Sequence, residues 1–528
     1  MDINRPTKSI WMEKEAPRVA EVTENLKCDV TVIGAGVAGL LTAYKLLKDG
    51  LSVVVIDDGK IAGGQTQRTT AHITAMLDSR YCELESLHGT DKARQVAQSH
   101  IKAIDWIEGI IKNESIACQF ARLPGYLFID PKSDPAHFQT KHDELEKELA
   151  ALARVGFDGA ILEKALPAFG VEVTCIKVEN QAQFHILEFI TGVVQAIANM
   201  GGRLFSHCHI TEIKDGEPVT LLTNNGRTIE AGSVVVATNS PVSNWLAIHS
   251  KVAAYRSYVI SAQCEESIPD GLYWDTEDPY HYIRCQKTDD KNYLIIGGED
   301  HRTGQENDYE TRFAKLEDWA RTFIPGLGPL EYKWSGQVYE TVDGLPYIGH
   351  DPGHSKNVYV ATGMSGVGMS ESALAALLLS DLIAGRESSL QSVYEPTRIT
   401  FGAAGEFLKE NISTAGQYLE HFGSSAAELS DIAPGEGAVI ARGLGKAAVF
   451  RSENGSAISC SAICPHMKAV VRWNSLEKSW DCPAHGSRFD SCGKVLDGPA
   501  NSDLEAAEIA GDDEQLLSLT NQIAPLEA

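Results

Sequence analysis

Four side chains near the C-terminus combine two thiols and two imidazoles in a spacing that suits metal binding. Cys464-Pro-His466 and Cys482-Pro-Ala-His485 form two short pairs, separated by the fifteen residues 467–481. Cysteine and histidine are ligands that both zinc and iron–sulfur clusters take from proteins. Zinc ribbons usually place two cysteines within two to four residues of each other, whereas each pair here joins a cysteine to a histidine. The pattern favours a [2Fe–2S] cluster over zinc.

A stretch near the N-terminus has the pattern of a dinucleotide-binding turn. The apolar run 28–33 is followed by Gly34-Ala-Gly36-Val-Ala-Gly39, by a helical apolar pattern over 40–47 and by a second apolar run that ends in Asp57-Asp58. Glycines at these positions allow a tight strand-to-helix turn, a close approach of backbone to a pyrophosphate, and close packing of helix on strand. A carboxylate at the strand end suits ribose hydroxyls. The motif alone leaves FAD and NAD both open.

Two further glycine-rich stretches extend this pattern. Residues 63–72 read Gly-Gly-Gln-Thr-Gln-Arg-Thr-Thr-Ala-His, and residues 358–369 form an apolar run that enters a turn with three glycines. With these stretches the sequence resembles, over about residues 28–390, the D-amino-acid-oxidase-like flavoproteins, the group that contains glycine and sarcosine oxidases. In that family the chain leaves the FAD domain to build a substrate domain and returns near its end beside the flavin. The resemblance therefore implies FAD rather than NAD.

The same resemblance implies which residues surround the flavin. The cofactor-binding candidates are Gly34, Gly36, Ala38, Gly39, Asp57, Asp58, Gly64, Gln65, Thr66, Arg68, Thr69, Thr70, Ala71, His72, Ile210, Ala237, Thr238, Gly363, Met364, Gly366, Gly368 and Met369. Some amine-oxidising relatives attach FAD covalently through a histidine or cysteine near this stretch. The offset of His72 does not match those attachment positions, so we expect non-covalent FAD.

The C-terminal module, about residues 430–520, resembles a Rieske domain. The resemblance implies a [2Fe–2S] cluster whose ligands are Cys464, His466, Cys482 and His485. Rieske proteins of cytochrome complexes carry one more cysteine in each loop, where this sequence has Ala469 and Ala484, so we expect no disulfide across the cluster. A tyrosine of those proteins is Phe489 here, although Ser487 is kept. Because fewer donors reach the sulfurs, we expect a potential in the lower part of the Rieske range.

A tyrosine-rich region in the middle of the chain is the candidate substrate site. Six of the 16 tyrosines lie between residues 255 and 293, and alternation places Tyr280, Tyr282 and Arg284 on one face of a strand. An arginine beside phenols can hold a carboxylate through two hydrogen bonds, although dense aromatics also suit any sheet. Oxidases of the family that the sequence resembles bind amino-acid carboxylates with Arg and Tyr. The substrate-binding candidates are therefore Tyr258, Tyr282 and Arg284.

Together the two modules resemble a fusion of an FAD-dependent amine or amino-acid dehydrogenase with a Rieske domain. A flavin takes up two electrons as a hydride, whereas the cluster carries one. The pair therefore predicts hydride transfer to FAD from a C–H next to nitrogen, with electrons leaving singly for an acceptor protein or carrier. A reductase that feeds a partner oxygenase is an alternative, but its usual second G-x-G-x-x-G unit is not found in the sequence. A non-catalytic redox sensor is the other alternative.

Composition limits the remaining possibilities. The net charge of −26 repels phosphates and anionic lipid, which argues against nucleic-acid and membrane-surface partners. Eleven scattered cysteines and an N-terminus without a signal-peptide pattern predict a reducing, cytoplasmic setting. The longest weakly polar run, 30–44, is too short to span a bilayer.

These patterns predict an α/β Rossmann-type FAD-binding domain with an interleaved α+β substrate domain, followed by a small all-β Rieske domain. The expected parts are an N-terminal extension at 1–27, the oxidoreductase at 28–395, a linker at 396–429, the Rieske domain at 430–520 and an acidic tail at 521–528. The FAD parts of the oxidoreductase are about 28–80, 160–245 and 335–395. Its substrate parts are about 81–159, with a helical pattern, and 246–334.

Overall fold

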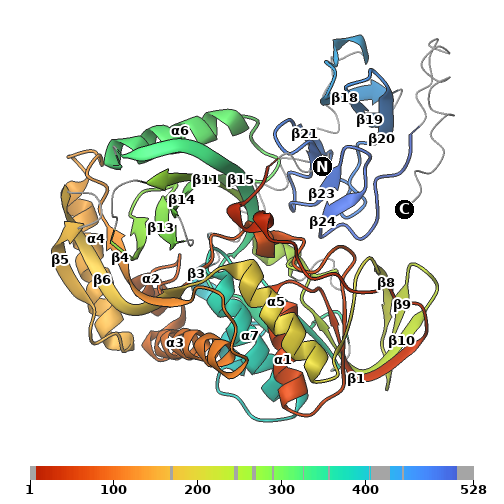
Figure 1. Cartoon of the computed structure of the whole chain (residues 1–528), viewed down its shortest axis with the longest axis horizontal. Coiled ribbons are helices and arrows are strands. Elements are labelled where there is room, and N and C mark those ends of the chain that lie inside the picture. The colour runs from red at the N-terminus through yellow and green to blue at the C-terminus, as the bar shows by residue number, and fades with distance from the viewer. Residues whose placement is uncertain are drawn as a thin grey trace. The chain divides into compact units, whose positions relative to one another are not determined.

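The chain folds into two compact units (Figure 1). The larger unit contains Lys8–His301 and Thr311–Phe407, and the smaller unit contains Met1–Thr7, Arg302–Glu310 and Leu408–Ala528. The computed structural model describes residues 7–166, 171–242, 248–264, 269–287, 291–324, 326–354, 357–403, 405, 429–442 and 445–507. Most of the expected linker and all of the acidic tail lie outside the described residues, so those boundaries remain predictions.

The first sheet of the larger unit has eight strands and a parallel centre. Its order is β16-β17-β10-β1-β2-β7, with the hairpin β8–β9 attached to β10. The strands from β17 to β7 are parallel, as expected for a dinucleotide-binding domain. The bounds are β1 Leu26–Ile33, β2 Val53–Ile56, β7 Arg203–Phe205, β8 Ile210–Lys214, β9 Val219–Thr223, β10 Thr228–Val236, β16 Tyr347–His350 and β17 Val358–Thr362.

The second sheet of the larger unit has nine strands and is mostly antiparallel. Its order is β15-β11-β14-β13-β12-β4-β6-β3, with β5 paired to β6. The bounds are β3 His72–Ile73, β4 Ala121–Phe128, β5 Ile161–Leu166, β6 Val171–Gln183, β11 Val252–Cys264, β12 Leu272–Asp275, β13 Tyr282–Lys287, β14 Asn292–Arg302 and β15 Leu327–Thr341.

The middle of the chain differs from the sequence prediction in two places. The helical pattern expected over 81–159 is interrupted by β4, which contains Pro124 and Gly125 and has weak strand propensity. Pairing with β6 and β12 holds it in the sheet. Residues 161–166 and 171–183, which we expected in an FAD part, form β5 and β6 of this same sheet, because β6 pairs with β4 along most of its length.

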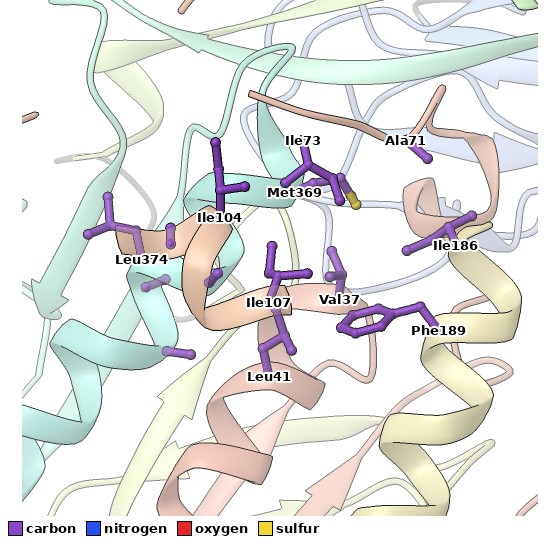
Figure 2. Packing of buried hydrophobic residues seen from close by; sticks show 14 of the residues in the cluster. Val37, Leu41, Ala71, Ile73, Ile104, Ile107, Ile186, Phe189, Met369 and Leu374 are labelled. Atoms are coloured by element: carbon purple, nitrogen blue, oxygen red, sulfur yellow. The ribbon is translucent and has the colours of Figure 1, made fainter. Parts of the chain in front are cut away.

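Helices α1, α3, α5 and α7 meet in one apolar core (Figure 2). Helix α1 packs against α5 and α7, and α3 packs against α7. Ala71 and Ile73 reach the same core from the end of the 63–72 stretch, which fixes the place of that stretch on the helices. The helix bounds are α1 Val37–Lys48, α2 Tyr81–His88, α3 Thr90–Asn113, α4 Phe138–Val155, α5 Ile186–Asn199, α6 Tyr309–Phe323, α7 Gly368–Ile383 and α8 Gln391–Tyr394. Among the residues described, no helix has both the length and the apolar character needed to cross a bilayer.

Five consecutive backbone carbonyls, those of residues 67–71, each accept a hydrogen bond from a distant side chain. The donors are Ser9 Oγ to carbonyl 67 (2.6 Å), Trp334 Nε1 to carbonyl 68 (2.8 Å), Trp11 Nε1 to carbonyl 69 (2.6 Å) and Arg284 Nη1 to carbonyls 70 and 71 (3.0 and 2.9 Å). We call these four side chains the carbonyl clamp. Because the segment belongs to no sheet or long helix, the clamp supplies the partners that its buried carbonyls require.

Two clamp residues lie in the N-terminal extension, to which the sequence assigned no role. The short 3-10 turn Ile10–Glu13 buries Trp11 completely. The indole ring also contacts the imidazole of His185, and the Arg284 guanidinium lies 5.4 Å from the indole centroid. The extension from Lys8 onward is therefore part of the core of the larger unit.

The described part of the smaller unit is all β, with two antiparallel sheets. Trp480 and Phe489 fill its apolar centre, and a buried ion pair joins Arg488 to Asp481 at 3.0 Å. The segment Arg302–Glu310 belongs to this unit, and Gln305 Nε2 donates to Pro483 O at 3.2 Å. The bounds are β18 Glu436–Arg442, β19 Gly445–Arg451 and β20 Ala457–Ser461 in one sheet, and β21 Arg472–Asn474, β22 Ser479–Asp481, β23 Arg488–Asp490 and β24 Val495–Asp497 in the other.

The carbonyl clamp predicts that Trp11→Phe destabilises the larger unit. The substitution keeps an aromatic ring but removes the donor to the half-buried carbonyl of Thr69, which costs about 1 kcal/mol. Urea denaturation followed by the helical circular-dichroism signal measures this loss. Trp106→Phe is the matched control, because the half-buried Trp106 indole makes no recorded hydrogen bond within the described chain. An equal loss in both variants would show that the hydrogen bond does not contribute.

Candidate flavin site and metal centre

The glycine turn between β1 and α1 has no room for side chains. A Cβ on Gly39 would lie 1.9 Å from Gly34 O, and a Cβ on Gly34 would lie 2.4 Å from Ala237 O. A Cβ on Gly36 would lie 3.1 Å from Thr66 Oγ1, which itself accepts the first N–H of α1. Gly36 is the N-cap of this 12-residue helix and offers no side-chain cap. The turn is thus tight, and its N-cap glycine provides no side chain to the N–H groups at the start of α1. Both features fit a bound pyrophosphate.

Asp57, at the end of β2, braces the same turn. Its carboxylate accepts the N–H of Ala35 at 2.6 Å and the N–H of Gly59 at 2.8 Å. Burial and the neighbouring charge of Asp58 raise the pKa of Asp57 to about 6. Asp58 is exposed, and its Oδ2 lies 3.5 Å from His209 Nδ1. A carboxylate has about four acceptor sites, so the ribose-binding role predicted for Asp57 remains open to it.

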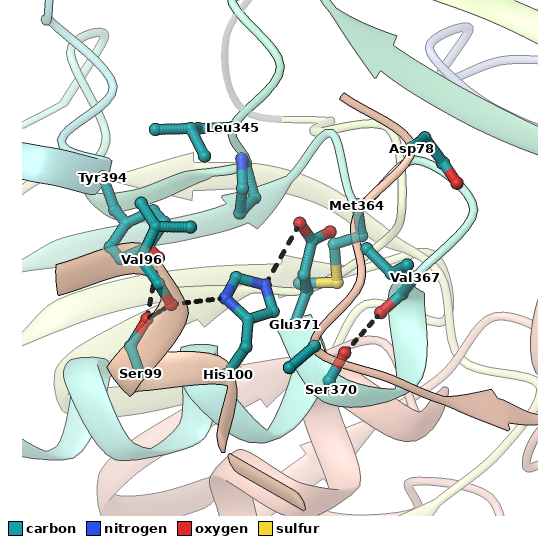
Figure 3. Close-up of polar contacts among 12 residues, drawn as sticks. Asp78, Val96, Ser99, His100, Leu345, Met364, Val367, Ser370, Glu371 and Tyr394 are labelled. Carbon is teal, nitrogen blue, oxygen red and sulfur yellow. Dashed lines mark hydrogen bonds and ion pairs between the residues drawn. The ribbon is translucent and has the colours of Figure 1, made fainter. Parts of the chain in front are cut away.

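The chain just after the 63–72 stretch meets the returning glycine-rich segment at the start of α7, where Asp78 lies near Val367 and Ser370 (Figure 3). Ser370 Oγ donates to Thr74 O at 2.7 Å, and the Gly366 N–H donates to Asp78 Oδ2 at 2.7 Å. Behind this turn, His100 Nε2 on α3 lies 3.7 Å from the buried Glu371 Oε1. The segment that follows the 63–72 stretch is thus joined to the returning segment, although some 290 residues separate the two in sequence.

Several cofactor candidates also serve the protein's own structure. Gln65 Oε1 accepts the N–H of Gln337, and Arg68 Nη1 donates to Ser335 O, so β15 supports the 63–72 stretch. Thr69 Oγ1 accepts the N–H of Ala71. The remaining candidates lie at the following places. Ile210 and Met369 are buried in apolar clusters, and Ala38 and Gly368 lie on helices α1 and α7. The others are in loops: Gly64 precedes the short turn Gln65–Arg68, Thr238 follows β10, and Gly363 and Met364 follow β17.

His72 is a buried imidazole with one nitrogen that has no partner among the described residues. Its Nδ1 lies 3.0 Å from Thr70 Oγ1, whereas its Nε2 is buried and makes no such contact. Burial and the positive charge of Arg284 lower the pKa of His72 to about 3, so the ring is neutral. A buried, unpartnered nitrogen at the end of the 63–72 stretch fits contact with a bound flavin.

Tyr282 belongs to a group of five polar side chains beside His72, which we call the tyrosine–carboxylate cluster. Its members are Asp78, Ser257, Tyr280, Tyr282 and Asp300. The Tyr282 hydroxyl lies 2.8 Å from Ser257 Oγ, and the Tyr280 hydroxyl donates to Asp78 Oδ1 at 3.3 Å. The two tyrosine rings are 5.7 Å apart, and Tyr282 meets His72 edge to face at 5.7 Å. The cluster thus adjoins the segment predicted to wrap the flavin.

The two carboxyl groups of this cluster hold protons more tightly than usual. Burial and the negative charge of Asp78, opposed by a hydrogen bond from Ser257, raise the pKa of Asp300 to about 7. Burial also raises the pKa of Asp78, although Gly366 and Tyr280 donate to it. Asp300 Oδ1 is buried and finds no hydrogen-bond partner among the described residues.

Arg284 does not lie where a carboxylate-binding arginine should. It is fully buried, and its Nη1 donates to the carbonyls of the clamp and to Phe184 O, while Nη2 donates to the Gln286 side chain. Burial lowers its pKa to about 9. The guanidinium is therefore committed to protein carbonyls, which corrects the prediction that it holds a substrate carboxylate.

Tyr258 is also separated from the cluster. Its hydroxyl lies 2.8 Å from His301 Nε2, and its ring packs on Phe313 of α6. Because strand residues alternate between faces, Tyr258 and its neighbour Ser257 lie on opposite faces of β11. Of the three predicted substrate-binding residues, the structure brings only Tyr282 to the candidate site.

The sequence analysis missed Asp78, Ser257 and Asp300. One signal was present, because Gly297 and Gly298 interrupt β14 just before Asp300. A Cβ on Gly297 would lie 2.2 Å from the Tyr282 ring, so only glycine at this position leaves room for that ring beside the strand. Asp78 and Ser257 gave no comparable local signal.

The two predicted ligand loops of the smaller unit share one backbone design. Cys464 O accepts the N–H of Lys468 at 3.0 Å, and Cys482 O accepts the N–H of Gly486 at 3.0 Å. Both donor residues have positive φ, +66° for Lys468 and +80° for Gly486.

The four ligands are arranged as a thiol pair and an imidazole pair. The thiols of Cys464 and Cys482 hydrogen-bond to each other, which lowers the pKa of Cys464 and raises that of Cys482. The rings of His466 and His485 have centroids 5.1 Å apart. Within the described chain, no three of these ligand atoms lie within 4.8 Å of one another. One tetrahedral zinc would draw all four within about 4 Å, so the arrangement fits a two-iron cluster.

Further details of this centre match the sequence prediction. Backbone N–H groups of His466 and Met467 point at the Cys464 sulfur, as those of Ala484 and His485 point at Cys482. The buried Ser487 hydroxyl also bonds the Cys464 sulfur. Phe489 is buried beside the centre without a hydroxyl. All eleven cysteines are free thiols, so no disulfide crosses the site.

Comparison with known proteins agrees with this geometry. The model of the DAO family, FAD dependent oxidoreductase, matches residues 29–382, and that of the Rieske [2Fe-2S] domain matches residues 424–508. The putative Rieske 2Fe-2S iron-sulfur protein YhfW of Bacillus subtilis is 30% identical over 501 residues, which cover 94% of this chain and 96% of that protein. Gamma-glutamylputrescine oxidoreductase of Escherichia coli is 24% identical over 386 residues, covering 69% of this chain and 85% of its own.

Solved structures show the same fold for the larger part of the chain. Glycine oxidase from Geobacillus kaustophilus superposes with a TM-score of 0.60 at 17% identity, covering 71% of this chain and 100% of its own. L-proline dehydrogenase from P. horikoshii gives 0.57 at 18% identity, covering 71% and 98%. The predicted fold class, FAD and the [2Fe–2S] cluster are confirmed. The chain belongs to the DAO family of FAD-dependent oxidoreductases and carries a C-terminal Rieske [2Fe–2S] domain.

Proposed function

We propose that this oxidoreductase is a dehydrogenase that oxidises an amine or amino acid and delivers the electrons singly to an external acceptor. One observation carries the proposal: a single chain combines a DAO-type flavin fold with a separate unit whose thiol and imidazole pairs suit a Rieske cluster. An oxidase that returns its electrons to oxygen directly has no need of the second unit. The acceptor is a one-electron carrier or protein.

The reacting bond of the substrate is a C–H next to nitrogen. The carbon loses a hydride, the nitrogen lone pair closes a C=N bond, and water then splits the imine into a carbonyl compound and an amine. When bound, FAD takes up the hydride, and a Rieske cluster carries electrons one at a time. The neutral His72 and the Tyr282 ring lie beside the 63–72 stretch, where they can orient the substrate and exclude water.

Anaerobic mixing of the holoenzyme with a panel of amines and amino acids tests the proposal. Bleaching of the flavin absorbance by a member of the panel is the expected result. Bleaching by NADH alone would support a reductase that feeds a partner oxygenase. Absence of bleaching by every compound would contradict an amine or amino-acid dehydrogenase and leave the sensor alternative.

Gly36→Val is expected to yield folded protein that lacks FAD. Even a Cβ at this position would lie 3.1 Å from Thr66 Oγ1, and the two methyl groups of valine would occupy the space beside the helix N-terminus that a pyrophosphate needs. The ratio of flavin absorbance to protein, with circular dichroism for folding, measures the effect. Gly109→Val is the control, because this glycine lies within helix α3 and a Cβ there meets nothing within 4 Å. Full flavin content in Gly36→Val would exclude this turn as the FAD site.

Cys482→Ser is expected to remove the cluster and slow steady-state turnover without slowing flavin reduction. The serine oxygen replaces a thiolate ligand in a loop of the smaller unit, whereas the hydride step needs only substrate and flavin. Electron paramagnetic resonance reports the cluster, stopped-flow absorbance reports flavin bleaching, and a one-electron acceptor reports turnover. Cys492→Ser is the control, since this thiol is exposed and lies outside the ligand set. Unchanged turnover in Cys482→Ser would place the cluster off the electron path.

A further inference from the structure

The tyrosine–carboxylate cluster contains two carboxyl groups. Within the part of the chain that the structure describes, no cation is bound to either of them. The recorded partners of Asp78 are neutral, namely the Gly366 N–H and the Tyr280 hydroxyl. Asp300 Oδ1 is buried and lacks a hydrogen-bond partner within the described chain. A buried carboxylate oxygen without a partner is costly. The cluster therefore favours a ligand that brings donors and positive charge.

The cations nearest to these carboxyls are engaged elsewhere. Arg312 Nη1 donates to the backbone carbonyls of Glu299 and Asp300, and His281 pairs with Asp275 at 2.7 Å and with Glu299 at 3.4 Å. Arg80 acts on Asp78, and His281 and Arg312 act on Asp300, through longer-range charge without a hydrogen bond to the carboxyl. Arg284 donates to the carbonyls of residues 70 and 71, so it too is withdrawn. A substrate carboxylate would meet two negative groups here and find these cations committed elsewhere.

Aromatic rings continue from the carboxyls toward the 63–72 stretch. The rings of Tyr280, Tyr282, His72 and Trp274 form a chain with successive centroid separations of 5.7, 5.7 and 5.5 Å. The faces of tyrosine and tryptophan attract organic cations. His72 adds no opposing charge, because its ring is neutral. Carboxyl groups and aromatic rings together are the chemistry that recognises an ammonium group.

We propose that the substrate is an organic amine that binds as a cation against Asp78 and Asp300 and carries no carboxylate on its reacting carbon. This inference rests on the proposed function, since it names the substrate class of that same site. Tyr280 and Tyr282 flank the ammonium group, and Asp300 Oδ1 accepts one of its N–H donors. The Asp300 carboxylate then takes that proton, which frees the nitrogen lone pair that closes the C=N bond. An α-amino acid is disfavoured, because its carboxylate would be held beside the same two carboxyls.

Binding of two simple ions of equal chain length tests the charge preference directly. Isothermal titration of the oxidised holoenzyme with butylammonium chloride and with sodium butyrate compares a cation and an anion at the same site. Butylammonium is expected to bind at least about tenfold more tightly than butyrate. Butylammonium that binds no more tightly than butyrate, including no binding by either, would overturn the proposal.

Charge-removing variants assign the effect to the cluster. Asp300→Asn and, separately, Asp78→Asn are each expected to weaken butylammonium binding about tenfold or more, which is the usual size of a lost charge-assisted contact. Asp91→Asn is the matched control, because its side chain is 96% exposed on α3 and its recorded ion pair, with Arg94, is on the surface, so the substitution removes a charge without touching the cluster. FAD content and melting temperature verify folding. Unchanged affinity in both cluster variants would overturn the proposal.

Flavin bleaching distinguishes failure of the cationic-amine site from failure of the proposed dehydrogenase activity. Butylamine and norvaline are tested side by side, because norvaline is butylamine with a carboxylate on the reacting carbon. Bleaching by butylamine alone supports both proposals. Bleaching by norvaline alone upholds the dehydrogenase but overturns the cationic-amine site. Bleaching by neither, together with Asp300-dependent binding of butylammonium, upholds the site and contradicts oxidation of these amines.

Discussion

The carbonyl clamp is the constraint on which the larger unit depends. A buried backbone carbonyl must find a donor, and the segment 67–71 cannot use a sheet or helix for this purpose. Its donors come from the N-terminal extension, from β13 and from β15, so three distant parts of the chain are joined at one segment. The clamp occupies the carbonyl side of the segment. The neighbouring His72 Nε2, which has no hydrogen-bond partner within the described chain, remains for a ligand.

The clamp also determines the charge of the neighbouring substrate site. Arg284 is the arginine that the tyrosine-rich strand brings closest to the 63–72 stretch, and it donates to the carbonyls of residues 70 and 71. Its positive charge lowers the pKa of His72, which keeps that imidazole neutral. The carboxyls of Asp78 and Asp300 then face the site with no arginine bound to them in the described chain. If this cluster binds the substrate as we propose, holding the backbone and selecting the substrate are linked through the Arg284 side chain.

The parts that sequence analysis predicted well are those whose chemistry is local. The cluster ligands lie in two short turns with the same backbone hydrogen bonds, and the glycine turn after β1 is complete within six residues. Strand β4 could not be predicted, because its pairing with β6 and β12 outweighs the weak propensity of a segment with Pro124 and Gly125. The role of Arg284 was misassigned for a similar reason. Alternation predicts the face on which a side chain lies, but not which distant carbonyl it meets there.

The two cofactor sites consequently differ in how they tolerate change. Each cluster-binding turn closes on its own backbone, so its shape depends on residues within five positions of the cysteine. The flavin segment has no such closure, and its shape depends on Trp11, Arg284 and Trp334. A self-contained turn can be joined to many folds, which suits a Rieske domain that forms a separate unit here. The flavin segment, in contrast, is held from three distant elements. It therefore joins the N-terminal extension to the nine-stranded sheet, and a substitution in one of these parts must be matched by the others if the segment is to keep its shape.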